Sequence, residues 1–390
     1  MKIIQSGTFE VKAGGVATCV YAMLQSLNQI GIDAQLFAYE PEENSRVIGT
    51  EVKANYTERP FKSKYNKLQI ACGYKKNLKR LGEVDVYHAN GVWLYDTYAM
   101  VDVARKQKIP YVIMPHGMLY PEDINKSNKT LKHLFLKLRL LKDLNQAACV
   151  LATCEEEAKH CRELGVTSPI AIIPNSIKAT EYPQKKFNVN ARVVGYIGRV
   201  SKRKNIEGLI YAWNNLRKQC ELKNAQERFE NSKLMIIGAG DDEYLEFLKS
   251  EARRLELSNV VFTGFLSGKE KDAALEQVEI LCMPSEFENF GMVITEGLVR
   301  GIPCIATKGA PWRDLETNNC GWWVDYAQNA INDAVEKAFF TSLRDIEQMS
   351  QNGKELVKKK YSIDITAHQL KKLYQWIVGD GIIPDFMYKG

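Results

Sequence analysis

The alternation of short apolar runs with amphipathic segments constrains the fold of this chain most strongly. Strands buried on both faces read as continuous apolar runs, and parallel strands need a helix-length connection between them. The pattern therefore predicts parallel α/β sheets with helices on both faces. The expected strands are residues 2–5, 34–39, 84–88, 111–114, 149–152 and 170–173 in the first half, and 193–197, 234–237, 260–262, 280–283, 304–306 and 321–324 in the second.

The length of the chain and one polar stretch predict two domains. A chain of 390 residues suits two domains of about 150 to 200 residues each. The first series of strands ends before Pro174, and a polar stretch with Pro183 and two lysines precedes the second series. We predict an N-terminal domain over residues 1–182, a linker over 183–190, a second domain over 191–362, and a final helix and tail over 363–390.

The composition favours a cytoplasmic protein without a membrane-spanning helix. No apolar run reaches the length of about 18 residues that a spanning helix needs, and residues 1–4 read as a strand rather than a signal peptide. The nine cysteines are an odd number without a C-x-x-C pair, and no Cys/His set has zinc spacing. We therefore expect reduced, buried thiols and no bound metal.

Two lysine-rich segments make the net charge of +6 uneven. Residues 62–80 carry seven cations and residues 126–142 carry six, and neither segment contains an acid. The second segment also has leucines at helical spacing. Such a helix lies on an anionic membrane or packs its leucines on its own domain, or does both, with the apolar face inward and the lysines near lipid headgroups. Nucleic acid is not an expected partner, because no recognisable binding motif accompanies the charge.

The segment from Ser285 to Glu296 places two carboxylates around a strand-to-helix turn. Glu288 follows the expected strand 280–283, and Glu296 lies in the expected helix 291–300. Open α/β sheets bind ligands at the carboxyl ends of their strands. Free N–H groups at a helix start suit anionic and sugar oxygens, while carboxylates accept hydrogen bonds from hydroxyls. The combination indicates a sugar-nucleotide site, whereas the spacing alone fits solvated helix-end charges equally well.

This segment resembles the E-x7-E signature of retaining group 1 (family 4) glycosyltransferases of the polysaccharide-biosynthesis type. Glu288, Phe290, Gly291 and Glu296 match its usual form, and Gly297 stands where alanine is common. The resemblance implies the GT-B fold, in which two doubly wound, Rossmann-like domains face each other across a cleft. The last helix would cross back to the N-terminal domain.

The resemblance also assigns donor-binding roles. Glu296 would hold the ribose hydroxyls, and Glu288 with the backbone from Asn289 through Phe290 and Gly291 to Met292 would hold the donor sugar. Arg199 and Lys204 follow the expected strand 193–197 and match the family's diphosphate ligands. Cations at this position would stabilise the leaving nucleoside diphosphate.

Other strand ends carry further candidates. Gly14 and Gly15 form the first βα turn and either approach the donor or serve the turn alone. His116, in Pro-His-Gly, matches the family's active-site histidine, although a lone histidine is more often structural. His88 is a weaker acceptor-side candidate that a buried structural role explains nearly as well. Gly264 lies where family members bind the base.

One glycine-rich segment fails a familiar pattern. Gly238 and Gly240 begin a dinucleotide fingerprint, but Glu243 replaces its third glycine. This makes a nicotinamide oxidoreductase a poor alternative. The turn either borders the nucleotide or only joins a strand to a helix.

The resemblance as a whole implies transfer of a hexosyl unit from a UDP or GDP sugar to an acceptor hydroxyl with retained configuration. It implies no cofactor, no metal and no protein nucleophile. The expected acceptor is a glycan, in particular a lipid-linked glycan of capsule, exopolysaccharide or lipopolysaccharide synthesis. The enzyme would then work at the inner face of the plasma membrane. The alternatives are a GT-B sugar-nucleotide epimerase and a catalytically silent nucleotide-sugar-binding protein.

Overall fold

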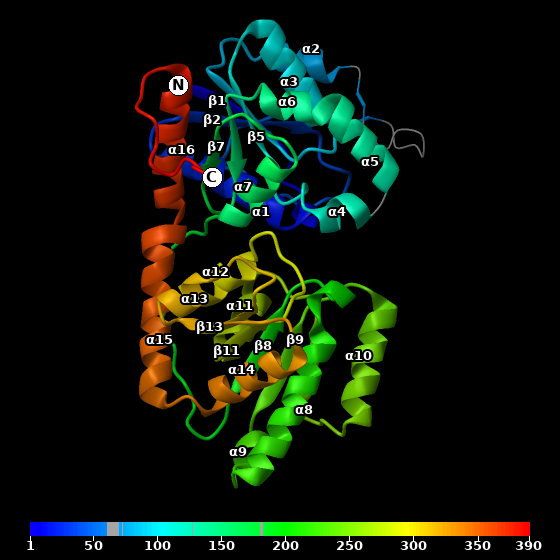
Figure 1. Cartoon of the computed structure of the whole chain (residues 1–390), viewed down its shortest axis with the longest axis vertical. Helices are drawn as coiled ribbons and strands as arrows, with labels where there is room; N and C mark the ends of the chain where they lie inside the picture. The colour runs from blue at the N-terminus through cyan, green and yellow to red at the C-terminus, as the bar shows by residue number, and fades with distance from the viewer. Residues whose placement is uncertain (61–69, 72, 127, 180–181) are drawn as a thin grey trace. The chain divides into compact units, whose positions relative to one another are not determined.

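The chain forms two compact units in the computed structural model, which describes residues 1–60, 70–71, 73–126, 128–179 and 182–390. Unit 1 comprises residues 1–178 and 362–390, and unit 2 comprises residues 179–361 (Figure 1). Residues 183–190, which we expected to be a linker, belong to unit 2, where Lys185 Nζ donates to the Leu275 carbonyl at 3.4 Å. Three lysines of the first basic segment, in 61–69, lie outside the described residues.

Unit 1 contains a seven-stranded parallel sheet in the order β3-β2-β1-β4-β5-β6-β7. Six of these strands coincide with expected ones to within about two residues. The exception is β3, which sequence reasoning missed because Asn55 and Thr57 interrupt its apolar character and it lies at the sheet edge. The strands are β1 (Lys2–Ser6), β2 (Asp33–Tyr39), β3 (Ala54–Thr57), β4 (Val86–Asn90), β5 (Tyr111–Met114), β6 (Cys149–Ala152) and β7 (Ile170–Ile172).

Helices cover both faces of this sheet, and neighbouring strand residues point to opposite faces. Ile3 packs with α1 (Gly15–Gln29) and α16 (Ile363–Val378), so the C-terminal helix is part of unit 1. Ile4 packs on the other face. The helices there are α2 (Tyr74–Lys79), α3 (Tyr95–Gln107), α6 (Leu141–Asn145) and α7 (Glu155–Glu163), and the connections include η1 (Val11–Ala13), α4 (Pro121–Lys126), α5 (Lys129–Phe135) and the π-helical turn η2 (Leu136–Leu140).

Unit 2 contains a six-stranded parallel sheet in the order β10-β9-β8-β11-β12-β13. Its largest core cluster lies where α8 (Ile206–Leu222) and α14 (Gln328–Phe340) pack on one face, around the fully buried Trp213. The strands are β8 (Val193–Ile197), β9 (Lys233–Ile237), β10 (Val260–Gly264), β11 (Ile280–Met283), β12 (Cys304–Thr307) and β13 (Gly321–Val324). The other helices are η3 (Lys202–Lys204), α9 (Gln226–Glu230), α10 (Asp242–Arg254), α11 (Gly268–Gln277), α12 (Met292–Val299), α13 (Asp314–Thr317), α15 (Leu343–Leu356) and η4 (Val357–Tyr361).

The predicted pair of doubly wound α/β domains is confirmed, and both sheets have a switch point. The chain fills one side of each sheet from its first strand and then returns to fill the other side, so β1 lies beside β4 and β8 beside β11. Crevices form at the carboxyl ends of such strand pairs. The candidate residues follow these strands or their neighbours. No helix in the described parts of the chain is long and apolar enough to cross a bilayer.

Candidate active site

In unit 2 the loops after β8 and β11 meet in an ion pair between Lys204 and Glu288. The Ser285 hydroxyl donates to the same Glu288 oxygen at 2.8 Å. Both charged side chains are mostly buried, with 19% and 12% of their surfaces exposed. Two residues that the sequence analysis assigned to different ligand groups therefore contact each other directly.

Neighbouring backbone fixes the loop that carries Glu288. The Glu288 N–H donates to the Gly309 carbonyl at 2.8 Å, and the Glu286 N–H donates to the Arg203 carbonyl at 2.9 Å. A Cβ at Gly309 would lie 2.0 Å from the Glu286 carbonyl oxygen. Only glycine permits this approach, so the 308–312 segment supports the candidate site rather than only following β12.

Aromatic packing fixes the start of α12. The Phe290 ring lies 5.2 Å from Trp312, which is fully buried and lies 5.0 Å from Tyr361. Gly291 has φ 82° and caps the helix, which begins at Met292, one residue later than predicted. The first-turn N–H groups of a helix lack intrahelical acceptors. Packing of these three aromatic rings therefore positions the backbone N–H groups that we expect to bind the donor sugar.

The second carboxylate, Glu296, pairs with a lysine that the sequence analysis did not select. Lys271 Nζ of α11 lies 2.6 Å from Glu296 Oε2. Close packing also explains why glycine follows this glutamate at position 297. A Cβ at Gly297 would lie 2.9 Å from Leu281 Cδ2 and 3.0 Å from Cys304 Sγ. The helix therefore packs more closely on β11 and β12 than an alanine here would allow without a shift.

Arg199 extends from the loop after β8 as an exposed side chain. The adjoining turn after β9 supports this loop through its glycines. A Cβ at Gly238 would lie 1.9 Å from the Gly198 oxygen, and one at Gly240 would lie 2.1 Å from the Val200 oxygen. The failed fingerprint is thus explained by close packing of two loops. Gly264, at the end of β10, accepts a hydrogen bond from the Gly238 N–H at 2.9 Å.

In unit 1, His116 and Asn90 join the carboxyl ends of β5 and β4. Asn90 Oδ1 lies 2.8 Å from His116 Nε2, while Asn90 Nδ2 donates to the Ser6 carbonyl at 2.8 Å and to Gln5 Oε1 at 3.2 Å. Because the amide nitrogen faces acceptors, its oxygen must accept, and we assign the proton to His116 Nε2. Burial lowers the pKa of His116 to about 4. The imidazole is therefore neutral near pH 7, with Nδ1 as its acceptor.

A buried carboxylate that the sequence analysis missed holds the turn after His116. Glu157 accepts hydrogen bonds from the Gly117 N–H at 2.5 Å and from the Thr153 N–H and hydroxyl at 2.7 Å each. Burial raises the pKa of Glu157 although these hydrogen bonds oppose the rise. His116 itself has φ 55°, a left-handed conformation. Glu157 stabilises this turn and so orients the histidine.

His88 has no exposed surface. Its Nδ1 lies 2.7 Å from the Tyr374 hydroxyl of α16, and burial lowers its pKa to about 3. A side chain without exposed surface cannot reach an acceptor. The structure therefore favours the structural alternative, in which His88 fastens the C-terminal helix to β4.

The turn with Gly14 and Gly15 is open to solvent. Gly14 has φ 65° and caps α1, and a Cβ at either glycine would meet no described atom within 4 Å apart from its chain neighbours and, at Gly15, the backbone of α1. Packing inside unit 1 therefore does not require the absence of a side chain at Gly15. Free space at the start of a 15-residue helix fits approach by a ligand.

Comparison with known proteins identifies the class. Residues 13–181 match the family described as Glycosyltransferase Family 4, and residues 178–356 match Glycosyl transferases group 1. The chain belongs to the group 1 glycosyltransferases with the GT-B fold. An uncharacterized glycosyltransferase of Methanocaldococcus jannaschii is 24% identical over 93% of this chain and 94% of that protein. The alpha-monoglucosyldiacylglycerol synthase of Streptococcus pneumoniae is 21% identical over 98% and 86%.

Solved structures share the fold of the whole chain. Sucrose-phosphate synthase from Thermosynechococcus elongatus has a TM-score of 0.75 at 17% identity, covering 97% of this chain and 99% of that one. Anabaena HepE, in complex with UDP and glucose, has a TM-score of 0.71 at 17% identity, covering 95% and 98%. At these identities the likeness establishes the GT-B fold, and the substrates belong to those proteins.

Proposed function

We propose that this glycosyltransferase moves a hexosyl unit from a nucleoside diphosphate sugar to an acceptor hydroxyl, with retention of the anomeric configuration. The main support is the Lys204–Glu288 pair at the β8/β11 switch point. A diphosphate would replace Glu288 as the partner of Lys204. The released carboxylate would then accept hydrogen bonds from the donor sugar hydroxyls.

The candidate cations account for the charge that develops during transfer. As the bond between the anomeric carbon and the diphosphate oxygen breaks, negative charge grows on the diphosphate. Lys204 and Arg199 would stabilise it. The acceptor hydroxyl oxygen forms the new bond to the anomeric carbon from the face that the diphosphate leaves, and its proton passes to a diphosphate oxygen. This route needs neither a protein nucleophile nor a metal ion.

The second carboxylate would undergo the same exchange. Glu296 would leave Lys271 to accept the ribose hydroxyls. In unit 1 the neutral His116 would accept a hydrogen bond from the donor sugar's hydroxymethyl group at Nδ1. The hydrogen bond to Asn90 fixes the tautomer that this role requires.

We further propose a UDP or GDP sugar as donor and a lipid-linked glycan of capsule, exopolysaccharide or lipopolysaccharide synthesis as acceptor. Two relatives support the chemical class: HepE binds UDP and glucose, and the pneumococcal synthase carries diacylglycerol in its name. The reaction would take place at the inner face of the plasma membrane.

Thermal unfolding with UDP, GDP and ADP, and then with their sugars, tests this proposal. We expect one nucleotide to stabilise the wild type and to lose this effect in Glu296→Ala and Lys204→Ala. Lys249→Ala is the matched control, because its exposed ion pair with Glu246 lies on α10 of the same unit. A separate incubation of the enzyme with the donor sugar alone tests the alternative. Formation of an epimer of the donor in the absence of acceptor would favour the epimerase over the transferase.

A further inference from the structure

The helical segment formed by α5, η2 and α6 carries leucines that the described part of unit 1 leaves exposed. Leu131, Leu134 and Leu138 expose 63%, 54% and 72% of their surfaces. Residues at spacings of three and four lie on one face of a helix. The alternative in which the leucine stripe packs on its own domain is therefore wrong for these three residues.

The opposite face of the same segment attaches it to unit 1. Leu136, Leu140 and Leu144 are buried in the core cluster of that side of the sheet. The segment is thus apolar on two faces, and only one is covered. A surface helix normally has one apolar stripe, which faces the core, so the outer leucines have no covering partner among the described residues of this unit.

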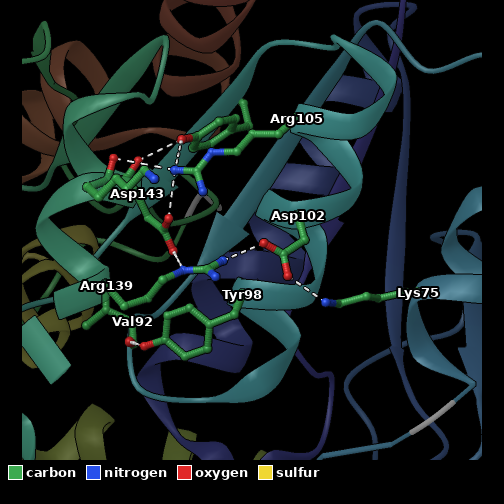
Figure 2. Close-up of polar contacts among 9 residues, drawn as sticks. Lys75, Val92, Tyr98, Asp102, Arg105, Arg139 and Asp143 are labelled. Atoms are coloured by element: carbon green, nitrogen blue, oxygen red, sulfur yellow. Dashed lines mark hydrogen bonds and ion pairs between the residues drawn. The ribbon is translucent and has the colours of Figure 1, made fainter.

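An ionic network fixes the orientation of this segment (Figure 2). Arg139 of η2 lies 2.6 Å from both Asp102 of α3 and Asp143 of α6. Arg105 lies 2.7 Å from the other Asp143 oxygen, and Lys75 lies 2.5 Å from Asp102. Asp143 is 1% exposed. Because breaking a buried, paired charge is costly, rotation of the segment cannot bury the outer leucines.

Two cations lie beside the exposed leucines by helical spacing, because Lys137 follows Leu134 by three residues and Lys142 follows Leu138 by four. Residues 129–142 contain no acid, and Lys129, Lys137 and Lys142 are exposed. Within the described parts of the chain these three lysines form no ion pair. Lys132 differs, because it lies 5.2 Å from the Trp93 ring and donates to the Asp123 carbonyl at 2.6 Å. Lys137 and Lys142 therefore carry charge beside the leucines that no described ion pair neutralises.

We propose that Leu131, Leu134 and Leu138 with Lys137 and Lys142, the leucine–lysine face, dock on an anionic lipid bilayer. Leucine side chains on such a face enter the boundary between headgroups and acyl chains, while lysines reach lipid phosphates. A membrane matches both the apolar stripe and the positive charge beside it. Docking would bring the enzyme to the lipid-linked acceptor of the proposed function, on which the biological role of this face rests. Docking itself requires neither donor nor acceptor.

Vesicle flotation of the full chain tests the proposal without substrates. We expect binding to vesicles of phosphatidylglycerol and phosphatidylcholine, and much weaker binding to phosphatidylcholine alone. The triple variant Leu131→Gln/Leu134→Gln/Leu138→Gln should lose at least about tenfold in affinity, since burial of one leucine corresponds to roughly that factor. Its thermal unfolding should match the wild type, because the replaced side chains are exposed. Lys137→Glu/Lys142→Glu should weaken binding more at low salt than at high salt.

A matched control is Ile382→Gln/Ile383→Gln, which removes two apolar side chains of the same unit that are 89% and 69% exposed. This variant should bind vesicles like the wild type. Equal vesicle binding by the triple leucine variant, or no binding by the wild type, would overturn the proposal. A leucine-dependent dimer in sedimentation without vesicle binding would also overturn it, and would assign the face to a second copy of the chain. Failure here leaves the nucleotide-binding test of the transferase reaction unaffected.

Discussion

The two switch points of this glycosyltransferase are built from opposite kinds of interaction. At β1/β4, neutral groups form a buried hydrogen-bond network through Asn90 and His116. At β8/β11, charged groups form partly exposed ion pairs, Lys204 with Glu288 and, nearby, Lys271 with Glu296. The same fold therefore carries a buried neutral network in one unit and ion pairs in the other.

This difference matches the two chemical parts of the proposed donor, a charged diphosphate and a neutral sugar with hydroxyl groups. Buried polar groups stay satisfied only if their partners remain in place, so a neutral network orients one acceptor atom rigidly. In the proposed exchange Lys204 keeps an anionic partner, because the diphosphate takes the place of the Glu288 carboxylate, and the released carboxylate accepts hydrogen bonds from the sugar hydroxyls. We infer that unit 2 compensates charge and unit 1 positions hydroxyl groups.

Removing the cation of the Lys204–Glu288 pair should have the largest effect. Lys204→Ala should lower kcat/KM by about 10²- to 10³-fold, the usual loss for one group that stabilises transition-state charge. Initial rates of nucleoside diphosphate release with a saturating acceptor measure this effect. Lys249→Ala should stay within about twofold of the wild type, as expected for an exposed residue. Similar rates for Lys204→Ala and this control would refute the assignment.

Breaking the neutral network should affect stability and activity together. Asn90→Ala leaves the His116 Nε2–H and the Gln5 amide oxygen without their present partner. Such buried groups cost about 1–3 kcal/mol each. We expect urea unfolding to show a loss of that order and kcat/KM to fall by at least about tenfold. Unchanged stability would mean that the network does not position His116.

Adding a side chain at the open turn of unit 1 should change donor binding without lowering the stability of the fold. Gly15→Ala adds a methyl group that would meet no described atom within 4 Å beyond the adjoining residues and the backbone of α1 itself. Alanine is favoured over glycine in a helix by up to about 1 kcal/mol, so the melting temperature should stay or rise slightly. If the donor approaches this turn, KM for the donor should increase several-fold. A variant with equal or higher stability and unchanged KM would assign Gly15 to the turn alone.

A further expected effect concerns pH. The folded-state pKa values of His116 and His88, about 4 and about 3, lie below the usual value near 6.5. The unfolded chain therefore binds protons first, and folding stability falls as pH drops from about 6.5 towards 4. At pH 5 the loss is on the order of 1–2 kcal/mol per histidine. Urea unfolding of wild type and His88→Gln at pH 7 and 5 checks this, because the variant should lose less. NMR titration of the His116 ring above pH 5.5 should show no protonation.

The sequence predicted the repeating architecture well, because parallel strands are buried on both faces and read as apolar runs. It missed β3, whose polar edge position removes that signal. The loops after the strands were also correctly predicted to carry Lys204, Glu288 and His116. A strand end can be located in the sequence because the apolar run stops there.

The missing parts all depend on contacts between distant segments. Asn90, Glu157 and Lys271 belong to ordinary helix or strand patterns, and only the fold brings them to the candidate residues. The leucine stripe of residues 131–141 was ambiguous for a related reason. A second leucine series, Leu136, Leu140 and Leu144, competes for the same core, and periodicity alone does not decide which series is buried.

The most direct test of the central claim is the affinity of UDP and GDP, measured by calorimetry, for wild type, Lys204→Ala and Glu288→Ala. If Lys204 exchanges Glu288 for the diphosphate, Lys204→Ala should weaken nucleotide binding. Glu288→Ala should tighten it, because the lysine no longer has a competing partner. At the same time, Glu288→Ala should lower the rate of sugar transfer. Equal weakening of nucleotide binding in both variants would contradict the exchange.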